Sequence, residues 1–459
     1  MMMRQIFIAL MIAAFCSAAQ FAKAQTEPTL YFMNSLPQVV YTNPAAMPKY
    51  KFSLGLPGSS IYGLYANNGF RYNDLTVAQG DSTVADMNKF YGALKKKNYL
   101  TFAAQGDLFR LSLKVNPRIY FTYNLSTKTF NRTMIPKGLT AIFSEGTSVL
   151  VSQTTNISPL TENMAYIESS WGASYVVDKN LTVGMHLKLL KGAGNVTTNK
   201  SIVNLTIGDD YQVTAVADID AKTSGIHNFD EVGFKVEDHW RDYLKNTGFA
   251  IDLGALYKIN DRLTVGASLI DIGSITWKND LYGYRLNPEK ANYTFEGVSL
   301  QKLIDGDEEY LDDTADSLEE NFDFEEGRIA KYRTPIPGKI YFSGNYEIKK
   351  NLFVGALLFA EKFRGRFAPG FSATVHKEFG RRFSTSLSYT ITQRAFNNLG
   401  LGLSLNLPPI QIYLVGDNLL RAPFALAADG NLNSFVNNTR YFNVRAGLNF
   451  VFGWDKDQE

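Results

Sequence analysis

Side chains capable of catalysis or metal binding are sparse in this chain of 459 residues. There are four histidines, and no G-x-S-x-G nucleophile elbow, G-x-x-x-x-G-K phosphate loop or H-E-x-x-H zinc motif occurs. His227 and His239 enclose several acidic residues and could hold a metal ion. Two histidines twelve residues apart in a charged segment are more typical of a solvated loop. We therefore predict no metal site, no cofactor and no enzymatic activity.

Acidic side chains form a second group, between residues 305 and 326, where twelve Asp and Glu residues occur. Divalent cations prefer such oxygen ligands, but the spacing lacks the EF-hand order of ligands and its glycine. A solvated loop is the simpler interpretation. Cation binding by this run is the alternative, and a calcium-dependent rise in thermal stability would reveal it.

A third group consists of charged or titratable residues in segments that alternate between apolar and polar side chains. Its members are His186, Lys188, Asp252, Lys258 and Arg445, each on the polar side of its segment. They could face a lumen, where they would select a solute or hold an internal segment. Alternatively, they neutralise one another across neighbouring strands. Either interpretation depends on the elements that carry them.

Alternation with a period of two is clearest at the C-terminal end. From Phe442 to Phe452 every second residue is apolar, and Asn443, Arg445 and Asn449 lie between. Such a stretch of about ten residues is long enough for a tilted strand to cross a membrane. A soluble β-sandwich shows the same alternation, but repetition favours a membrane barrel. Further copies lie at residues 181–189, 249–259, 383–391 and 399–407.

Short polar turns join these segments in pairs. Residues 181–184, 263–266 and 352–355, each directly after such a turn, read LTVG, LTVG and LFVG. The chain predicts fourteen antiparallel strands, an even number as a barrel requires, with short turns in the periplasm and long inserts outside. The strands are expected to start near residues 51, 107, 118, 171, 181, 249, 263, 340, 352, 367, 383, 399, 410 and 441.

Three details qualify this topology. Pro57 and Gly58 interrupt the first strand. Inserts are expected at residues 127–168, 192–247 and 277–337, and the last two are long enough to contain short strands or helices. Asp271 falls on an apolar face by parity, so we expect it at the outer interface or beside a β-bulge, because a carboxylate facing lipid at mid-membrane is costly.

The first residues predict export. Arg4, an apolar run at residues 6–19 and the sequence Ala22-Lys23-Ala24 are typical of a signal peptide cleaved after Ala24. The run is too short for a membrane-spanning helix. Its removal leaves a formally neutral chain without cysteine, which excludes disulfides and offers no basic footprint for nucleic acid. The 25 Tyr, 32 Phe and 36 Gly suit strands, turns and aromatic girdles.

Asn43-Pro44-Ala45, just before the first strand, resembles a segment of FadL-type outer-membrane proteins, including PorV-like members from Bacteroidota. Residues 257–268, 271–277 and 443–450 look like an uncharacterised Bacteroidota barrel family. The resemblance implies fourteen strands with an N-terminal plug in the lumen. It also implies either passage of hydrophobic molecules, as in FadL-type proteins, or partnership with a secretion machinery, as in PorV-like ones. The tail after Trp454 departs from the usual terminal aromatic residue.

The sequence as a whole predicts an all-β, transmembrane antiparallel barrel in the outer membrane, with long extracellular loops and lipid as its surroundings. Residues 1–24 form the signal peptide, 25–50 the plug, 51–454 the barrel and 455–459 a periplasmic tail. The predicted function is passage or binding of hydrophobic or small solutes. The alternative is a non-transporting membrane subunit that docks a secretion or surface-protein complex. A membrane phospholipase would need an outward Ser–His pair, and both strand histidines, His186 and His376, lie at inward positions.

Overall fold

The computed structural model describes residues 27–68, 70–79, 82–139, 151–209, 212–226, 245–286, 292–295, 325–392, 395–420 and 439–454. The predicted signal peptide, the predicted tail, His227 and His239 lie outside these ranges. So does the acidic run except for its last two residues. All statements below concern the described part of the chain.

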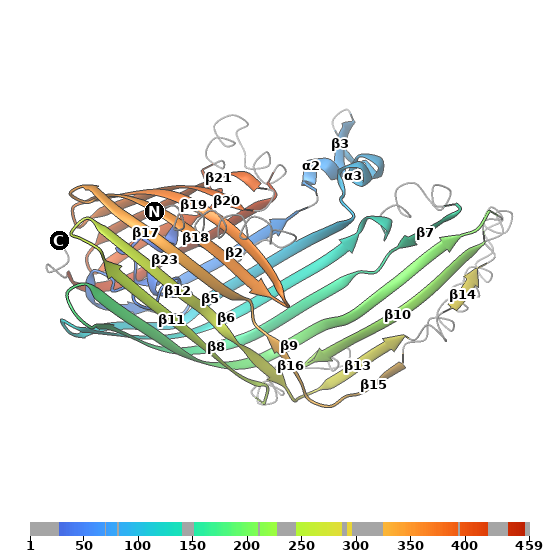
Figure 1. The fold of residues 1–459 in the computed structure, drawn as a ribbon, viewed down its shortest axis with the longest axis horizontal. Coiled ribbons are helices and arrows are strands. Elements are labelled where there is room, and N and C mark those ends of the chain that lie inside the picture. Colours follow the sequence, from blue (N-terminus) through green and yellow to red (C-terminus); the bar gives the residue numbers. More distant parts are fainter. Residues whose placement is uncertain are drawn as a thin grey trace, which may run out of the picture.

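Fourteen antiparallel strands close into a barrel, which confirms the predicted fold class (Figure 1). The first strand has two pieces, β1 (Tyr50–Gly55) and β2 (Ser60–Asn67), and both pair with β5 on one side and β23 on the other. This closure leaves no free edge at membrane depth. The other barrel strands are β5 (Lys97–Asn116), β6 (Ile119–Pro136), β8 (Leu160–Val176), β9 (Leu181–Ile207), β11 (Thr247–Lys258), β12 (Leu263–Trp277), β17 (Gly338–Lys349), β18 (Leu352–Phe363), β19 (Arg366–Phe379), β20 (Phe383–Thr392), β21 (Ala395–Leu407), β22 (Ile410–Gly416) and β23 (Tyr441–Trp454).

The gap between β1 and β2 lies where Pro57 and Gly58 predicted an interruption. Proline cannot donate to the strand ladder, and Gly58 adopts a φ of 76°, which a side chain would disfavour. Leu56, Pro57 and Gly58 are exposed, and pairing resumes at Ser60. The first strand therefore crosses the membrane with a break in its ladder.

The two ends of the barrel differ. The start of β1, the end of β23 and six tight turns lie together at one end, hereafter the short-turn end (Figure 1). The long inserts lie at the other, the long-loop end. One expectation needs correction, because β18 and β19 are joined at the long-loop end by Arg364 and Gly365 alone. Length alone therefore does not assign a turn to a side.

Several strands continue well past the barrel, into segments that were predicted as inserts. Residues 127–168 were expected to be an insert, yet β6 runs to Pro136 and β8 begins at Leu160. β9 continues to Ile207 and pairs there with β10 (Val213–Ser224), so a sheet projects beyond the rim (Figure 1). Short strands complete it: β7 (Gln153–Asn156), β13 (Leu281–Leu286), β14 (Asn292–Phe295), β15 (Glu325–Arg328) and β16 (Tyr332–Pro335).

The helices are short. The segment before β1 contains two 3-10 helices, η1 (Leu30–Phe32) and η2 (Pro37–Tyr41). Between β2 and β5 lie α2 (Tyr72–Leu75), α3 (Met87–Ala93) and a hairpin of β3 (Thr76–Gln79) and β4 (Ser82–Ala85). No helix in the described ranges is long and apolar enough to cross a membrane.

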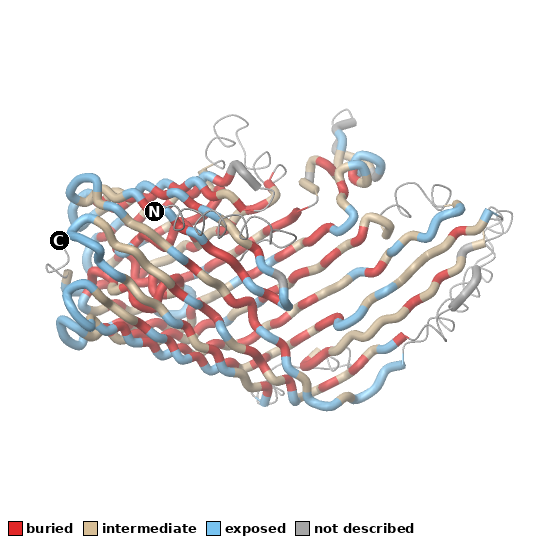
Figure 2. Tube along the Cα trace, viewed as in Figure 1, coloured by how far each residue is buried: buried red, intermediate tan, exposed pale blue. Residues whose placement is uncertain are grey.

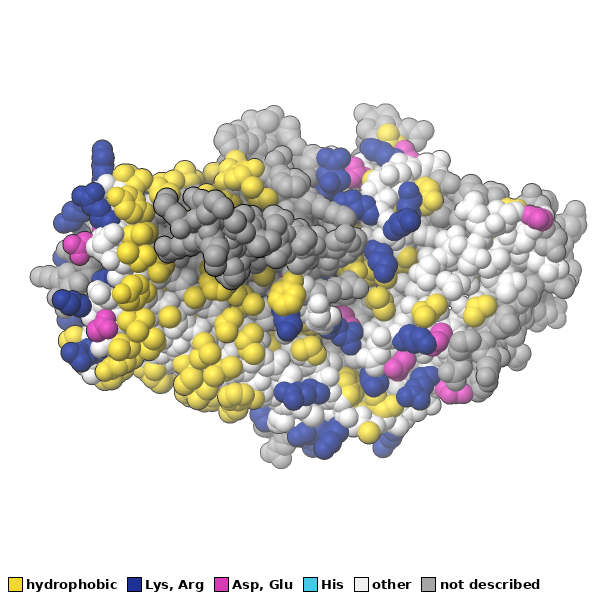
Figure 3. All heavy atoms as spheres, viewed as in Figure 1, with side chains coloured by type: hydrophobic (Ala, Val, Ile, Leu, Met, Phe, Trp, Pro, Cys, Tyr) yellow, Lys and Arg dark blue, Asp and Glu magenta, His cyan; other side chains and the backbone are white. Residues whose placement is uncertain are grey.

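Burial alternates along the barrel strands, as the sequence pattern predicts (Figure 2). On β9, Met185, Leu187 and Leu189 are exposed, whereas His186 and Lys188 between them are buried. Exposed apolar side chains cover the barrel strands, and on the face seen in Figure 3 they form a broad belt next to the short-turn end. Lipid solvates such a belt, and the polar residues face inward.

Candidate functional site

The segment before β1 lies inside the barrel as a plug, here residues 27–49. Its apolar side chains Leu30, Met33 and Leu36 are fully buried. They form one apolar cluster with the inward Tyr413 and with Val415 of β22. Its polar groups bond to the wall as well. Gln38 Nε2 donates to Asn449 Oδ1 at 2.8 Å, and the carbonyl oxygen of Thr42 accepts from Ser268 Oγ at 2.6 Å.

Glycines on the wall make room for the plug. A Cβ added at Gly184 would collide with the carbonyl oxygen of Pro44, and one at Gly355 would enter the ring of Phe32. Gly266, in the second copy of the repeat, also faces inward, toward Tyr31 and Ser343. The LTVG-like repeat at the strand openings therefore ends in a residue that lets the backbone or an aromatic ring approach closely.

The Asn43-Pro44-Ala45 motif is the turn of the plug that touches the wall. Asn43 Oδ1 accepts from the backbone N–H of Ala45 at 2.9 Å, and its Nδ2 donates to the Tyr31 hydroxyl at 3.1 Å. Ser174 Oγ of β8 donates to the Pro44 carbonyl at 2.7 Å. The motif is therefore held by an internal hydrogen bond and by one to the wall. Gly254 faces Asn43, and a side chain at that glycine would not fit.

Three of the sequence-predicted site residues meet in the lumen beside the plug. Asp252 Oδ2 lies 2.9 Å from His186 Nδ1 and 2.7 Å from Lys188 Nζ. Lys188 also reaches Asp271 Oδ1 at 2.6 Å. All four side chains are almost fully buried, and paired burial of this kind is tolerated only where the charges satisfy one another.

Asp271 reaches this cluster through a β-bulge, as one of the two predicted alternatives requires. The register between β11 and β12 shifts between Ile251 and Leu253, and Asp271 takes a φ of 60°. Its backbone N–H then donates to Asp252 Oδ1 at 2.7 Å. The bulge turns the carboxylate inward and leaves Ile272 exposed on the apolar face.

Sequence reasoning missed three partners in the same cluster. Lys339 Nζ lies 2.8 Å from Asp271 Oδ2, and Lys128 Nζ lies 2.8 Å from Glu168 Oε2. With Lys188, these make three ammonium groups against three carboxylates. A cavity of only about 40 Å³ remains here, room for a few water molecules, so the lumen is filled at this level.

The other two predicted site residues lie apart from the cluster. Arg445 is buried, pairs with Glu27 of the plug through Nε at 2.6 Å, and lies between the rings of Tyr41 and Tyr62. Lys258 is exposed and lines a polar hollow of about 440 Å³ at the short-turn end, below the plug. The structure thus brings together His186, Lys188 and Asp252, but neither Arg445 nor Lys258.

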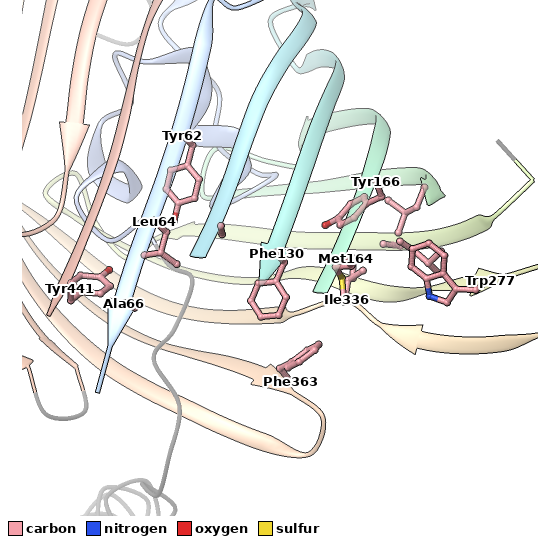
Figure 4. Close-up of a cluster of buried hydrophobic side chains, with 14 of the residues drawn as sticks. Tyr62, Leu64, Ala66, Phe130, Met164, Tyr166, Trp277, Ile336, Phe363 and Tyr441 are labelled. Carbon is pink, nitrogen blue, oxygen red and sulfur yellow. The ribbon is translucent and has the colours of Figure 1, made fainter. Parts of the chain in front are cut away.

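Toward the long-loop end the inner face changes from polar to apolar. Phe130, Met164, Trp277 and Phe363 come from different strands and belong to one buried cluster (Figure 4). The cluster continues onto the first and last strands, with Leu64 of β2 among its members. Inner faces of membrane barrels are ordinarily polar, so an apolar layer in the lumen is unusual.

The β18–β19 hairpin closes the lumen over this apolar layer. Phe363 at its tip meets Phe130 of the opposite wall, with ring centroids 5.2 Å apart (Figure 4). Arg132 Nη2 donates to Glu361 Oε1 at 2.7 Å, and its guanidinium lies over both rings. Arg364 at the turn pairs with Glu162 of β8. We call residues 361–364 the hairpin tip.

A larger apolar cavity, of about 980 Å³, follows the same strands on the outward side. Its floor is a register row of small residues across five strands, and Tyr65, Phe102 and Phe442 form one end. These three aromatic side chains occupy outward positions, so the cavity runs along the outer surface of the wall. The row is Gly63, Ala104, Thr129, Ala165 and Gly194.

Within the described residues, no group of three His, Cys, Asp or Glu side chains is placed to hold a metal ion. The closed sheet, its apolar exterior and the buried plug together define a membrane-spanning β-barrel with an internally plugged lumen. The chain belongs to a family of unknown function, DUF5723, whose model matches residues 44–417. No curated protein matches the sequence.

Among solved structures, the chain is similar to the Ralstonia pickettii toluene transporter TbuX, with 10% identity, coverage of 93% of this chain and 98% of that one, and a TM-score of 0.44. A Pseudomonas aeruginosa FadL homologue is 13% identical, with coverage of 95% of this chain and 98% of that one and a TM-score of 0.44. The TodX deltaS2S3 mutant monoaromatic hydrocarbon channel is 10% identical, with coverage of 91% of this chain and 94% of that one and a TM-score of 0.46. At such identities and scores, nothing about the ligand of this chain follows from the likeness.

Proposed function

We propose that the protein is an outer-membrane channel for small hydrophobic solutes, gated by the hairpin tip and by the plug. The observation that carries this proposal is the apolar layer on the inner face of the barrel. Apolar side chains lining a lumen would contact water, which is unfavourable unless a lid covers them or an apolar solute occupies the space. An apolar solute could replace the contact between Phe130 and Phe363 at little cost.

The half of the lumen nearer the short-turn end supports a gated path rather than an open pore. The plug and the charge cluster fill it, and the cavity of about 40 Å³ admits water only. Passage therefore requires that the plug or the cluster rearrange. Glu27 and Lys49, near the two ends of the plug, each form an ion pair with the wall, to Arg445 and Glu378 respectively. Those pairs are the contacts whose rupture would release it.

Uptake of an environment-sensitive fluorescent alkyl probe tests the proposal. Cells that carry the wild-type barrel should accumulate the probe faster than cells that lack it. A charged sugar of similar size should show no such gain. Met164→Gln places a polar amide in the apolar layer and should reduce accumulation several-fold. Leu205→Gln, on β9 beyond the rim, is the matched control and should behave as the wild type.

Equal accumulation with and without the barrel would contradict the channel proposal. Reduction by both variants to the same extent would show that the apolar layer has no particular role. Surface expression and resistance to unfolding on an unheated gel establish that each variant is assembled.

The projecting sheet favours a second candidate, a non-transporting subunit that docks an exported protein complex. β9 and β10 pair beyond the rim, where β9 runs from Asn195 to Ile207. Solute passage through the lumen does not require a sheet that extends so far. Shortening this hairpin by an equal number of residues on each strand separates the two functions. A channel should keep its probe uptake, whereas a docking subunit should lose its partner complex.

A further inference from the structure

Lysine and arginine side chains gather on the outward surface just beyond the apolar belt, at the long-loop end (Figure 3). Lys191 of β9 and Arg333 of β16 belong to one register row, separated by Thr247 and Thr276. Lys278 directly follows β12, and Lys331 directly precedes β16, two residues before Arg333. We call Lys191, Lys278, Lys331 and Arg333 the cationic patch.

The patch adjoins apolar surface on its membrane side. Leu189 and Phe249 face each other one outward position nearer the short-turn end, and 48% and 51% of their surfaces are exposed. Ile272 on β12 is exposed beside them. A molecule with acyl chains against these side chains would have its headgroup at the level of the cations.

Little in the described part of the chain neutralises Lys278, Lys331 and Arg333. Lys278 Nζ donates to Thr247 Oγ1 at 3.2 Å, and Arg333 Nε donates to Ser274 Oγ. Both acceptors are uncharged hydroxyls. Within the described residues, Lys278, Lys331 and Arg333 form no ion pair with a carboxylate. All three are exposed.

The opposite margin of the belt has a different character. At the short-turn end, cations such as Lys179 and Arg262 alternate with the exposed carboxylates of Asp178 and Asp261. Figure 3 shows dark blue and magenta groups mixed there. An uncompensated cationic surface is therefore a property of one margin and not of the barrel rim in general.

We propose that the cationic patch binds the phosphate groups of an anionic lipid in the membrane leaflet at the long-loop end. An arginine guanidinium offers paired donors to phosphate oxygens, and ammonium groups add charge at the same level. Cations at a membrane boundary favour anionic headgroups within about a Debye length. The site lies outside the lumen, so it stands whether or not the barrel conducts a solute.

Native mass spectrometry of the purified, detergent-solubilised full chain tests this site. The probes are a bis-phosphorylated glucosamine lipid, the same lipid without phosphate, and inorganic phosphate. The test variant carries Lys278→Gln, Lys331→Gln and Arg333→Gln. The control variant removes the same charge at the other margin, through Lys179→Gln, Arg262→Gln and Lys350→Gln. Migration on an unheated gel establishes that both are folded.

The wild type and the control variant should retain the phosphorylated lipid, and added salt should weaken its binding. The test variant should bind it about a hundredfold more weakly at low salt, since three boundary charges are lost. Undiminished binding by the test variant would overturn the proposal. So would equal retention of the phosphate-free lipid, which would assign binding to the apolar belt. Displacement of the lipid by inorganic phosphate at the same concentration would reassign the patch to a free anion.

Discussion

Lys188 Nζ and Asp271 Oδ1 lie 2.6 Å apart in the lumen, although simple alternation along β12 places Asp271 on the lipid side. The bulge at Asp271 resolves this conflict, because one extra residue reverses the direction of the side chain. The same bulge brings a backbone N–H to Asp252. A local backbone irregularity therefore organises the charge cluster around Lys188.

Asp271→Asn should destabilise the barrel strongly, because Lys188 and Lys339 lose the carboxylate they share while remaining buried. Removing one partner of a buried ion pair costs about 3–5 kcal/mol. The free energy of unfolding in detergent, from urea titration followed by tryptophan fluorescence, measures the loss. Asp261→Asn, in an exposed turn, is the control and should change stability by less than about 0.5 kcal/mol. Equal effects of the two variants would exclude a structural role for the cluster.

Gly184→Val should displace the plug, because a side chain there overlaps the Pro44 carbonyl. We expect a loss of about 1–3 kcal/mol and faster proteolysis of residues 27–49 in the folded barrel. Gly344→Val is the matched control, since no atom lies within 4 Å of a Cβ added at that glycine. Mass spectrometry of the limited digest reports the exposed segment. A plug that stays equally protected in both variants would show that the glycine is not needed for its fit.

Arg132 and Glu361 should be energetically coupled, because replacing either residue removes the charge that the other one pairs with. A double-mutant cycle with Arg132→Gln and Glu361→Gln should give a coupling of about 1–3 kcal/mol. Hydrogen exchange at residues 359–363 should accelerate in both single variants, because the hairpin tip loses its contact with the opposite wall. Additive effects on stability would mean that the pair does not hold the tip closed.

The insert between β2 and β5 should loosen in acid. Burial raises the pKa of Asp74, but hydrogen bonds from Arg71, at 3.0 Å, and the charge of Arg440 outweigh it and lower this pKa below its usual value. Because the pKa of this carboxyl group is lower in the folded chain than in the unfolded chain, its ionised form stabilises the fold at a pH above the pKa of the unfolded chain, near 4. That stability is lost as the pH falls through the pKa of the folded chain. Hydrogen exchange at residues 71–76 should therefore increase below about pH 4. Asp74→Asn should remove this pH dependence.

The barrel could be predicted because lipid imposes a rule on sequence. Wherever a strand crosses the membrane, every second residue must be apolar, and the C-terminal strand from Phe442 to Phe452 obeys this throughout. Beyond the membrane the rule no longer applies. The outward residues Thr127, Thr129 and Asn131 of β6 are polar, so no alternation of apolar and polar residues indicates that β6 continues.

The site was harder to predict than the fold. His186, Lys188 and Asp252 lie on strands whose alternation is clear, and their inward positions follow from parity. Lys128 and Glu168 lie in the parts of β6 and β8 that were predicted as an insert, and the outward residues of β6 there are polar. The contact between Phe130 and Phe363 joins opposite walls, and no local pattern encodes such a pairing. A break in alternation at Asp271 was the one local signal of the bulge.

Cross-linking the hairpin tip to the opposite wall tests the gated channel most directly. The only cysteine, Cys16, lies in the predicted signal peptide, so introduced thiols should be the only ones in the mature chain. Phe130→Cys with Phe363→Cys places two thiols across the lumen for a short thiol-to-thiol cross-linker. Lys362→Cys with Phe367→Cys, a register pair within one hairpin, is the control. We predict that cross-linking blocks alkyl-probe uptake only in the first variant and that cleaving the linker restores it. Unchanged uptake with the tip fixed to β6 would contradict the account.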